Sequence, residues 1–292
     1  MSGTSYRVIA GRAVLVGKQP DGDSVRFVPD DATLLRGLQN GDRVRVSADG
    51  SVQLRFDGID APELHYQGAE QPLGAVARDL LLQRLGFTAV EFAADGETVL
   101  TATPAAVPVV VLAQLVEVNG RPVSVVFAGA EADLAVLTTG NLVELTPALL
   151  AQSVNVWEAA NSVAYPLLYT STTAELRDVF RAAARTAREA RNGVWTQDST
   201  ASFPVTDLAA LGRAGVLVWP KLFRRAVDYL RQRTAGQSLP DWLATTPLQD
   251  DDLYLTPDTE GATPVALHTV LRQTEQQVVF PVDPIEVTVV ER

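Results

Sequence analysis

The sequence predicts a mixed fold in which a small β-barrel comes first and helices follow. Two observations carry this prediction. Up to about residue 129 the apolar segments are rich in β-branched residues and are separated by Asp, Gly and Asn turns. Beyond that point, apolar residues recur with helical spacing. Strands first and helices after is the order expected of a closed barrel with helices packed on it.

The predicted strands share β-branched residues and end at turn residues. They cover residues 6–15, 24–28, 43–47, 52–56, 90–99 and 107–127, the last with a hairpin turn at Asn119-Gly120. Apolar stripes predict helices over residues 72–85, 147–160 and 174–192. The third of these helices ends at Asn192-Gly193.

The C-terminal part has a different pattern, which predicts a boundary between residues 5–197 and an extension of residues 198–292. A linker is expected at 199–204, a short helix at 207–212, a longer helix from Pro220, and strands at 278–280 and 285–290. The extension therefore reads as a smaller α+β unit. Its apolar residues must be buried, and we expect them to pack against the preceding domain, with a second copy of the chain as the alternative. They are Phe203, Val216, Leu217, Val218, Trp219, Leu222 and Phe223.

Composition excludes several classes of protein. The chain has no cysteine, which excludes disulfides and thiolate metal sites. The histidines His65 and His268 lie far apart in sequence, so a zinc site is not expected. The apolar runs are too short to span a bilayer, and the first residues lack a secretory pattern. We therefore expect a cytoplasmic protein with no membrane partner.

Two segments carry the residues that suggest chemistry. The first is Pro-Asp-Gly-Asp-Ser-Val at 20–25, and the second is Leu-Arg-Phe-Asp-Gly-Ile-Asp-Ala-Pro-Glu at 54–63. Either segment alone is more simply explained as a turn or a strand end. Together they supply carboxylates for a hard metal ion and an arginine fork for a phosphate, and a hairpin could bring Asp23 beside Arg55, Asp60 and Glu63.

At these residues the chain resembles the thermonuclease (staphylococcal nuclease-like) family. The family signature is Asp-Gly-Asp-Thr/Ser, then Arg-x4-Asp-Thr/Ala-Pro-Glu, then a Gly-Arg-hydrophobic stretch, which here is Gly120-Arg121-Pro122-Val123. The segments around Ser153-Val154-Asn155 and 187–195 resemble the later helices of the family, and the resemblance covers about residues 5–197. It implies a five-stranded OB-fold barrel with three packed helices.

The resemblance also implies a calcium-dependent phosphodiesterase acting on DNA or RNA. In this reading Asp23 and Asp60 are carboxylate ligands of Ca²⁺, and Ala61 supplies a backbone carbonyl. Glu63 holds the attacking water and can act as general base. Arg55 and Arg121 grip the phosphate, and Tyr165 and Tyr169 contact the substrate.

The charge of the chain, −11, disfavours tight binding of duplex nucleic acid. We therefore expect single strands or short oligonucleotides as substrates. A non-catalytic nucleic-acid or protein-binding module is the alternative, and a structural or assembly protein that acts through its extension, by a partner or by self-association, is a third. Four arginines at helical spacing are more simply explained as a solvated face than as a nucleic-acid track. These residues are Arg177, Arg181, Arg185 and Arg188.

Overall fold

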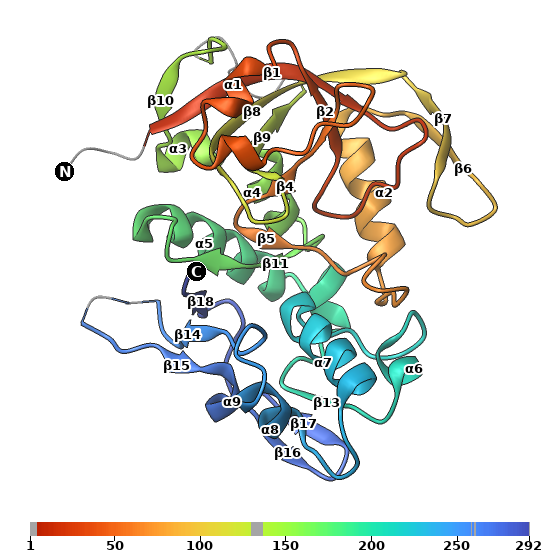
Figure 1. Ribbon diagram of the computed structural model, residues 1–292, viewed down its shortest axis with the longest axis vertical. Coiled ribbons are helices and arrows are strands. Elements are labelled where there is room, and N and C mark those ends of the chain that lie inside the picture. The colour runs from red at the N-terminus through yellow and green to blue at the C-terminus, as the bar shows by residue number, and fades with distance from the viewer. Residues whose placement is uncertain (1–4, 130–136, 258, 260, 292) are drawn as a thin grey trace. The chain divides into compact units, whose positions relative to one another are not determined.

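The computed structural model describes residues 5–129, 137–257, 259 and 261–291 (Figure 1). The chain forms two compact units, of which the first contains Met1–Asp57 and Arg78–Glu158, and the second contains Gly58–Ala77 and Ala159–Arg292. Both units combine strands and helices, and each is described by itself.

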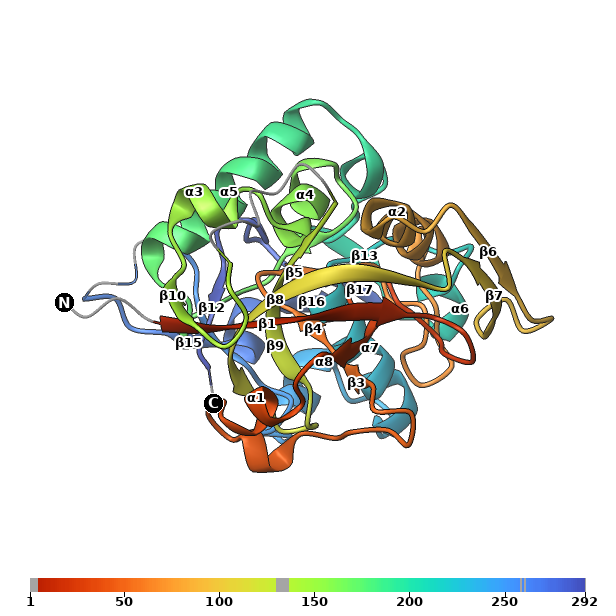
Figure 2. The same ribbon diagram turned by 90° about the horizontal axis from the view of Figure 1, so that it is seen from above.

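The first unit contains a barrel-like sheet whose strands follow the order β3-β2-β1-β8-β9-β4, with β10 also paired to β1. Figure 2 shows β8 beside β1 in this sheet. The strands are β1 Ser5–Val14, β2 Arg26–Pro29, β3 Val52–Gln53, β4 Arg55–Phe56, β8 Ala106–Val116, β9 Pro122–Ala128 and β10 Leu142–Glu144.

The sheet turns back on itself through a single residue. The strands at the two ends of the order, β3 and β4, are separated in sequence only by Leu54. The amide of Leu54 donates to the carbonyl of Val25 at 3.0 Å, and the amide of Phe56 donates to the carbonyl of Asp23 at 3.1 Å. Residues 23–25 therefore run beside residues 54–56, which nearly closes the sheet.

The core of the first unit consists of large side chains that are fully removed from solvent. They include Val8, Ile9, Phe27, Val111, Leu112, Val126 and Phe127. The sheet is accompanied by the helices α1 Thr33–Arg36 and α3 Pro147–Leu150, and by the two-stranded ribbon of β6 Ala89–Phe92 and β7 Val99–Thr103. The helices α2 Gly74–Leu85 and α4 Val154–Ala160 each cross from one unit to the other in sequence.

The described residues of the second unit form three small sheets. Most of its helices follow residue 170. Its strands are β5 Ile59–Asp60, β11 Tyr165–Pro166, β12 Leu168–Tyr169, β13 Ser202–Pro204, β14 Asp252–Tyr254, β15 Val265–Ala266, β16 Arg272–Thr274, β17 Gln277–Val279 and β18 Thr288–Val289. Its helices are α5 Ala174–Glu189, α6 Leu208–Leu211, α7 Pro220–Gln232, α8 Leu239–Ala244 and α9 Leu267–Val270.

One apolar core holds the second unit together. The buried residues Tyr165, Leu167 and Val194 belong to it together with the aromatic side chains of the extension. The Trp219 and Phe280 rings stack with centroids 6.1 Å apart. The expectation that the apolar residues of the extension are buried is confirmed for Phe203, Leu217, Val218, Trp219, Leu222 and Phe223, and Val216 is partly buried against the same core.

Several predicted elements differ from the structure. Residues 43–47 are not a strand, because Gly41–Arg43 forms a 3-10 helix and Ser47 closes a tight turn with Ser51. The predicted strand 90–99 is a hairpin, and the expected linker 199–204 contains β13. The predicted helix 147–160 breaks at Ser153, whose hydroxyl accepts a hydrogen bond from the Val156 amide and begins a second helix. The coarse fold, a barrel-like sheet with helices, is as predicted.

The prediction of a solvated face on α5 is wrong for two of its four arginines. Arg177 and Arg181 are buried, and Arg181 donates to the Ile285 carbonyl and to the Thr288 hydroxyl. Arg185 and Arg188 keep 44% and 42% of their side-chain exposure, and they pair with Glu286 and Asp283. Helical spacing alone could not indicate these partners in the extension.

The compact units do not follow the predicted boundary at residue 197, because residues 159–197 and 198–292 share one core. A chain that ends at Gln197 keeps the first unit whole, but it should expose Tyr165, Leu167 and Val194, lose structure over residues 159–197 and self-associate. Circular dichroism and size-exclusion chromatography of this fragment test the expectation. A monodisperse fragment with a sharp melting transition would instead support the domain division predicted from the sequence.

Candidate functional site

The predicted site residues divide between the two units. Asp23, Arg55 and Arg121 belong to the first unit, and Asp60, Ala61 and Glu63 belong to the second, as do Tyr165 and Tyr169. Each set is therefore built from its own neighbours.

In the first unit, the closure of the sheet brings two of the three residues together. Asp23 lies in the turn Gly22-Asp23, which the bridge between Asp21 and Ser24 closes, and its carbonyl accepts a hydrogen bond from the amide of Phe56. Strand β4 pairs in parallel with β9, which places Arg55 opposite Val123, two residues after Arg121. Strand pairing thus places all three residues in one region of the barrel-like sheet.

Arg121 is held by an acidic residue that the sequence analysis did not single out. Its Nε lies 3.0 Å from Oε1 of Glu117, across the Asn119-Gly120 turn. Burial alone would raise the pKa of Glu117, but the hydrogen bond and charge of Arg121 outweigh this effect and lower it. Glu117 is therefore ionised at neutral pH and orients Arg121.

Arg121 also lines a pocket of about 370 Å³ together with two other arginines. The lining residues are Arg26, Arg45, Gln53, Asn119, Gly120 and Arg121. The Arg26 side chain donates to the Ser47 hydroxyl at 3.0 Å. The Arg45 side chain is exposed, and its backbone amide donates to the Gly120 carbonyl at 3.0 Å. The sequence analysis did not single out Arg26 or Arg45. Both lie in segments that we expected to be strands, residues 24–28 and 43–47.

Gly120 is required for this arrangement. Its φ is +82°, and a Cβ at this position would lie 2.6 Å from both the Arg43 carbonyl oxygen and Cγ of Arg45. Only glycine combines this backbone conformation with the absence of a side chain. The hairpin turn therefore allows the Arg45 stem to lie against it.

A second unpredicted acid in the first unit is Glu158 of α4. It is fully buried, and within the described part of the chain neither of its carboxyl oxygens has a hydrogen-bond partner. Burial, with a smaller effect from the charge of Asp23, raises the pKa of Glu158 well above its usual value. A glutamate on the apolar side of a predicted helix was the signal that could have identified it.

In the second unit, the residues of the second signature segment lie on a short ribbon and the loop after it. Asp60 is opposite Tyr165 in the antiparallel pair β5–β11, and the Leu167 amide donates to the Gly58 carbonyl at 3.0 Å. Gly58 has a φ of +77°, and a Cβ there would lie 2.3 Å from the Phe180 ring. This close packing fixes the start of β5 and the position of Asp60.

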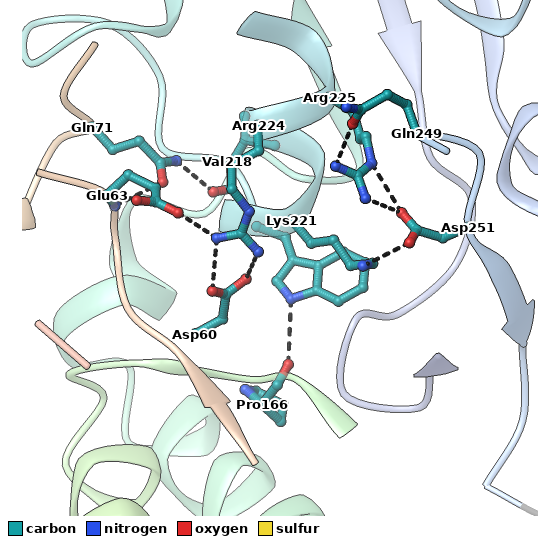
Figure 3. Close-up of polar contacts among 11 residues, drawn as sticks. Asp60, Glu63, Gln71, Pro166, Val218, Lys221, Arg224, Arg225, Gln249 and Asp251 are labelled. Carbon is teal, nitrogen blue, oxygen red and sulfur yellow. Dashed lines mark hydrogen bonds and ion pairs between the residues drawn. The ribbon is translucent and has the colours of Figure 1, made fainter. Parts of the chain in front are cut away.

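Asp60 and Glu63 share one cation, the guanidinium of Arg224 on α7 (Figure 3). The two terminal nitrogens of Arg224 lie 2.9 Å from Oδ1 and Oδ2 of Asp60, and Nη1 also donates to Oε1 of Glu63. Burial alone would lower the pKa of Arg224, but the two carboxylates raise it well above its usual value. The sequence analysis missed Arg224, since nothing in its local pattern indicates an acidic partner.

These carboxylates do not fit a calcium ion as they lie. Calcium takes six to eight oxygen ligands at about 2.3–2.6 Å, whereas both oxygens of Asp60 already accept the arginine fork. Among the residues that the structure describes, no group of three or more acidic, histidine or cysteine side chains could hold a metal ion. Ala61 is buried directly after β5.

The two tyrosines predicted to contact substrate have other surroundings. Tyr165 is fully buried, and its hydroxyl donates to Oδ1 of Asp198 at 3.0 Å. Tyr169 is half-buried, and the Lys221 ammonium lies 5.6 Å from its ring centroid. Tyr165 therefore serves the core of the second unit, which is not the position of a side chain that contacts substrate.

Comparison with known proteins adds no assignment, because no protein-family model and no curated protein matches the chain. Among the described residues, no helix is long and apolar enough to cross a membrane.

Glu158 leads to a prediction about stability and pH. Because its pKa is raised in the folded state, the wild type loses stability as pH rises from about 4.3, the usual pKa of glutamate, towards the raised value. Glu158→Gln has no such loss, so we expect it to be more stable than the wild type at pH 7 and closer to it at pH 4. Each unit of the pKa shift corresponds to about 1.4 kcal/mol.

Urea unfolding at both pH values measures this difference. Glu144→Gln, at an exposed position of β10, is the matched control and should change little. The same pH dependence in Glu158→Gln and in the wild type would contradict the burial argument.

Proposed function

We propose that the chain binds and hydrolyses phosphodiester bonds of DNA or RNA, as a nuclease of thermonuclease type on an OB-type barrel. The observation that carries the proposal is the arginine pocket of the first unit, which adjoins the signature residue Arg55. A preference for short single strands is part of the proposal, as is calcium dependence, for which Arg224 must first leave Asp60 and Glu63.

The pocket has the composition of a phosphate site. Three arginines and two residues with side-chain amides line it, and no acidic residue is among the described residues of the lining. Guanidinium groups bind phosphate oxygens through paired hydrogen bonds and do not lose their charge at neutral pH. Glu117 compensates part of the charge of Arg121, and the described lining gives Arg26 and Arg45 no acidic neighbour.

Arg55 lies one step along the strands from this pocket. It is two residues beyond Gln53, and its cross-strand partner Val123 is two residues beyond Arg121. Two residues of a strand span about 7 Å. A phosphodiester strand with one phosphate in the pocket could therefore present a neighbouring group to Arg55.

Arg55 and Arg121 have the chemistry that hydrolysis requires. Fixed donors that stabilise the charge developing on phosphate oxygens in the transition state lower the barrier, and in a preorganised site they act without rearrangement. Glu117 provides such preorganisation for Arg121. Asp60 and Glu63 bind Arg224 in this structure, so as they lie they are not available as calcium ligands.

The pocket also bears on the negative charge of the chain. Exposed charges act over about 8–10 Å at physiological salt, so three clustered arginines can attract a phosphate despite a net charge of −11. A small basic site favours short contacts with single strands and gives weak, salt-sensitive binding.

A second candidate function is favoured by a different observation. The pairing of Asp60 and Glu63 with Arg224 is what a non-catalytic nucleic-acid or protein-binding module would tolerate. Such a protein would bind oligonucleotides through the arginine pocket and cleave none of them, whether calcium or a chelator is present.

Arg55→Lys tests the hydrolytic proposal. The lysine keeps the charge but loses the fork, so we expect turnover of labelled single-stranded oligonucleotides to fall about 100-fold. The free energy of unfolding should change by no more than about 1 kcal/mol. Assays with calcium and with chelator are run in the wild-type background and in Arg224→Gln, which leaves the two acids without their cation. Equal turnover with lysine or arginine at position 55 would rule out a phosphate clamp.

Arg45→Ala tests the pocket. We expect about tenfold weaker binding of a single-stranded oligonucleotide, as one charge-assisted contact is lost. The slope of log affinity against log salt should also become shallower by about 0.7. Fluorescence anisotropy at several salt concentrations measures both quantities. Arg36→Ala, at an exposed position of α1 outside the pocket, is the control, and equal losses in the two variants would assign the effect to net charge alone.

A further inference from the structure

We infer that Arg224 is a built-in cation of the Asp60–Glu63 pair, through which helix α7 excludes a divalent metal ion from these two carboxylates. The inference rests on the proposed function only in taking the pair as the metal-binding part of a nuclease signature. It assigns a role to the extension, in which the sequence alone indicated no chemistry.

The guanidinium and a metal ion would compete for the same oxygens. Both carboxylate oxygens of Asp60 accept hydrogen bonds of 2.9 Å from Arg224, and Oε1 of Glu63 accepts a third. A calcium ion bound about 2.3–2.6 Å from these oxygens would occupy the space of the guanidinium nitrogens. Arg224 must therefore leave before the pair can coordinate a metal ion.

Burial makes this competition strong. The side chains of Asp60, Glu63 and Arg224 keep only 4%, 15% and 20% of their exposure. Where little water remains, removing one member of an ion pair leaves uncompensated charge at high cost. The three side chains sum to a charge of −1, so a cation is still attracted to the pair but meets an occupied site.

The arginine is held in place by the rest of one helix face. Four residues beyond Arg224, Asp228 accepts hydrogen bonds from Tyr66 and Gln67 at 2.8 and 2.7 Å. Three residues further, Arg231 donates to the Gln67 carbonyl at 2.7 Å. Positions i, i+4 and i+7 lie on one side of a helix. This side of α7 therefore binds the loop that follows Asp60 and Glu63.

The start of α7 is bound to the same region. The Trp219 indole donates to the carbonyl of Pro166, which pairs with Ile59 next to Asp60. Gln71 accepts a hydrogen bond from the Glu63 amide at 3.1 Å and donates to the Val218 carbonyl at 2.6 Å. Contacts on both sides of the ion pair thus fix Arg224 over the two acids, as Figure 3 shows.

The next residue of the helix provides a matched control. Arg225 also makes a largely buried ion pair, and its partner is Asp251. The Lys221 ammonium contacts the same carboxylate at 2.9 Å. Replacing either arginine by glutamine removes one guanidinium from α7. Only Arg224→Gln removes it from Asp60 and Glu63.

Isothermal titration calorimetry of the full chain with calcium chloride, without substrate, tests the inference. We expect weak or undetectable binding by the wild type and by Arg225→Gln, and binding at least about tenfold tighter by Arg224→Gln. Calcium should also raise the melting temperature of Arg224→Gln alone, because a ligand that binds only the folded state stabilises it. Equal affinity in the three proteins, or no binding in any of them, would overturn the inference.

A second variant decides the matter if Arg224→Gln does not fold. Arg224→Lys keeps the charge and replaces the fork by a single ammonium, so it should bind calcium more tightly than the wild type. Wild-type affinity in this variant would count against the inference.

Calcium binding and catalysis can fail separately. If Arg224→Gln binds calcium and cleaves no oligonucleotide, the inference stands and the proposed function fails. If the wild type binds calcium as tightly as the variant and cleaves, the proposed function stands and Arg224 excludes nothing.

Discussion

The second unit depends on the fork that Arg224 places on Asp60. This contact joins residues 164 positions apart and brings the end of segment 54–63 onto a helix of the extension. Buried ion pairs add little net stability, but the loss of one partner typically costs about 3–5 kcal/mol. Once the acids are buried at this place, the helix that carries the cation must stay with them. This constraint acts together with the apolar core, to which Ala69 belongs, to keep residues 58–77 with residues 159–292.

Most arginines of this acidic chain serve the structure. On α5, Arg181 binds the chain near Thr288, and Arg185 and Arg188 pair with acids of the same segment. On α7, Arg224 and Arg225 each hold a carboxylate. The arginine pocket of the first unit is different, since three arginines and no acidic residue are among the described residues that line it. This contrast is why the pocket carries the proposed function.

The proposed nuclease and the Arg224 contact describe one protein with two requirements. Phosphate binding draws on the arginines of the first unit, which need no change in the second. Metal binding would draw on acids that are already neutralised in part by an internal cation. If the proposal holds, the protein binds nucleic acid before it can cleave it, and mutation should separate the two activities.

The sequence by itself determined the local elements and the types of residue available for chemistry. The β-branched residues and the Asn119-Gly120 turn predicted the hairpin of β8 and β9. Helix-end signals predicted α5, and Pro220 with an apolar face predicted α7. Backbone sterics and the burial of one face act over a few residues, so a sequence pattern records them directly. The segment 54–63 likewise singled out both acids, with Asp60 expected to bind a metal ion and Glu63 expected to hold a water.

Only the tertiary structure decided which cation they have. Helical spacing places Arg224 on a polar side of α7 but does not name the acid opposite it. Likewise, the spacing of the α5 arginines did not indicate that Arg177 and Arg181 are buried. Tyr165 is part of the core, where its hydroxyl donates a hydrogen bond to Asp198. Such pairings depend on how distant segments pack. Packing is a property of the whole chain, and the neighbourhood of one residue does not reveal it.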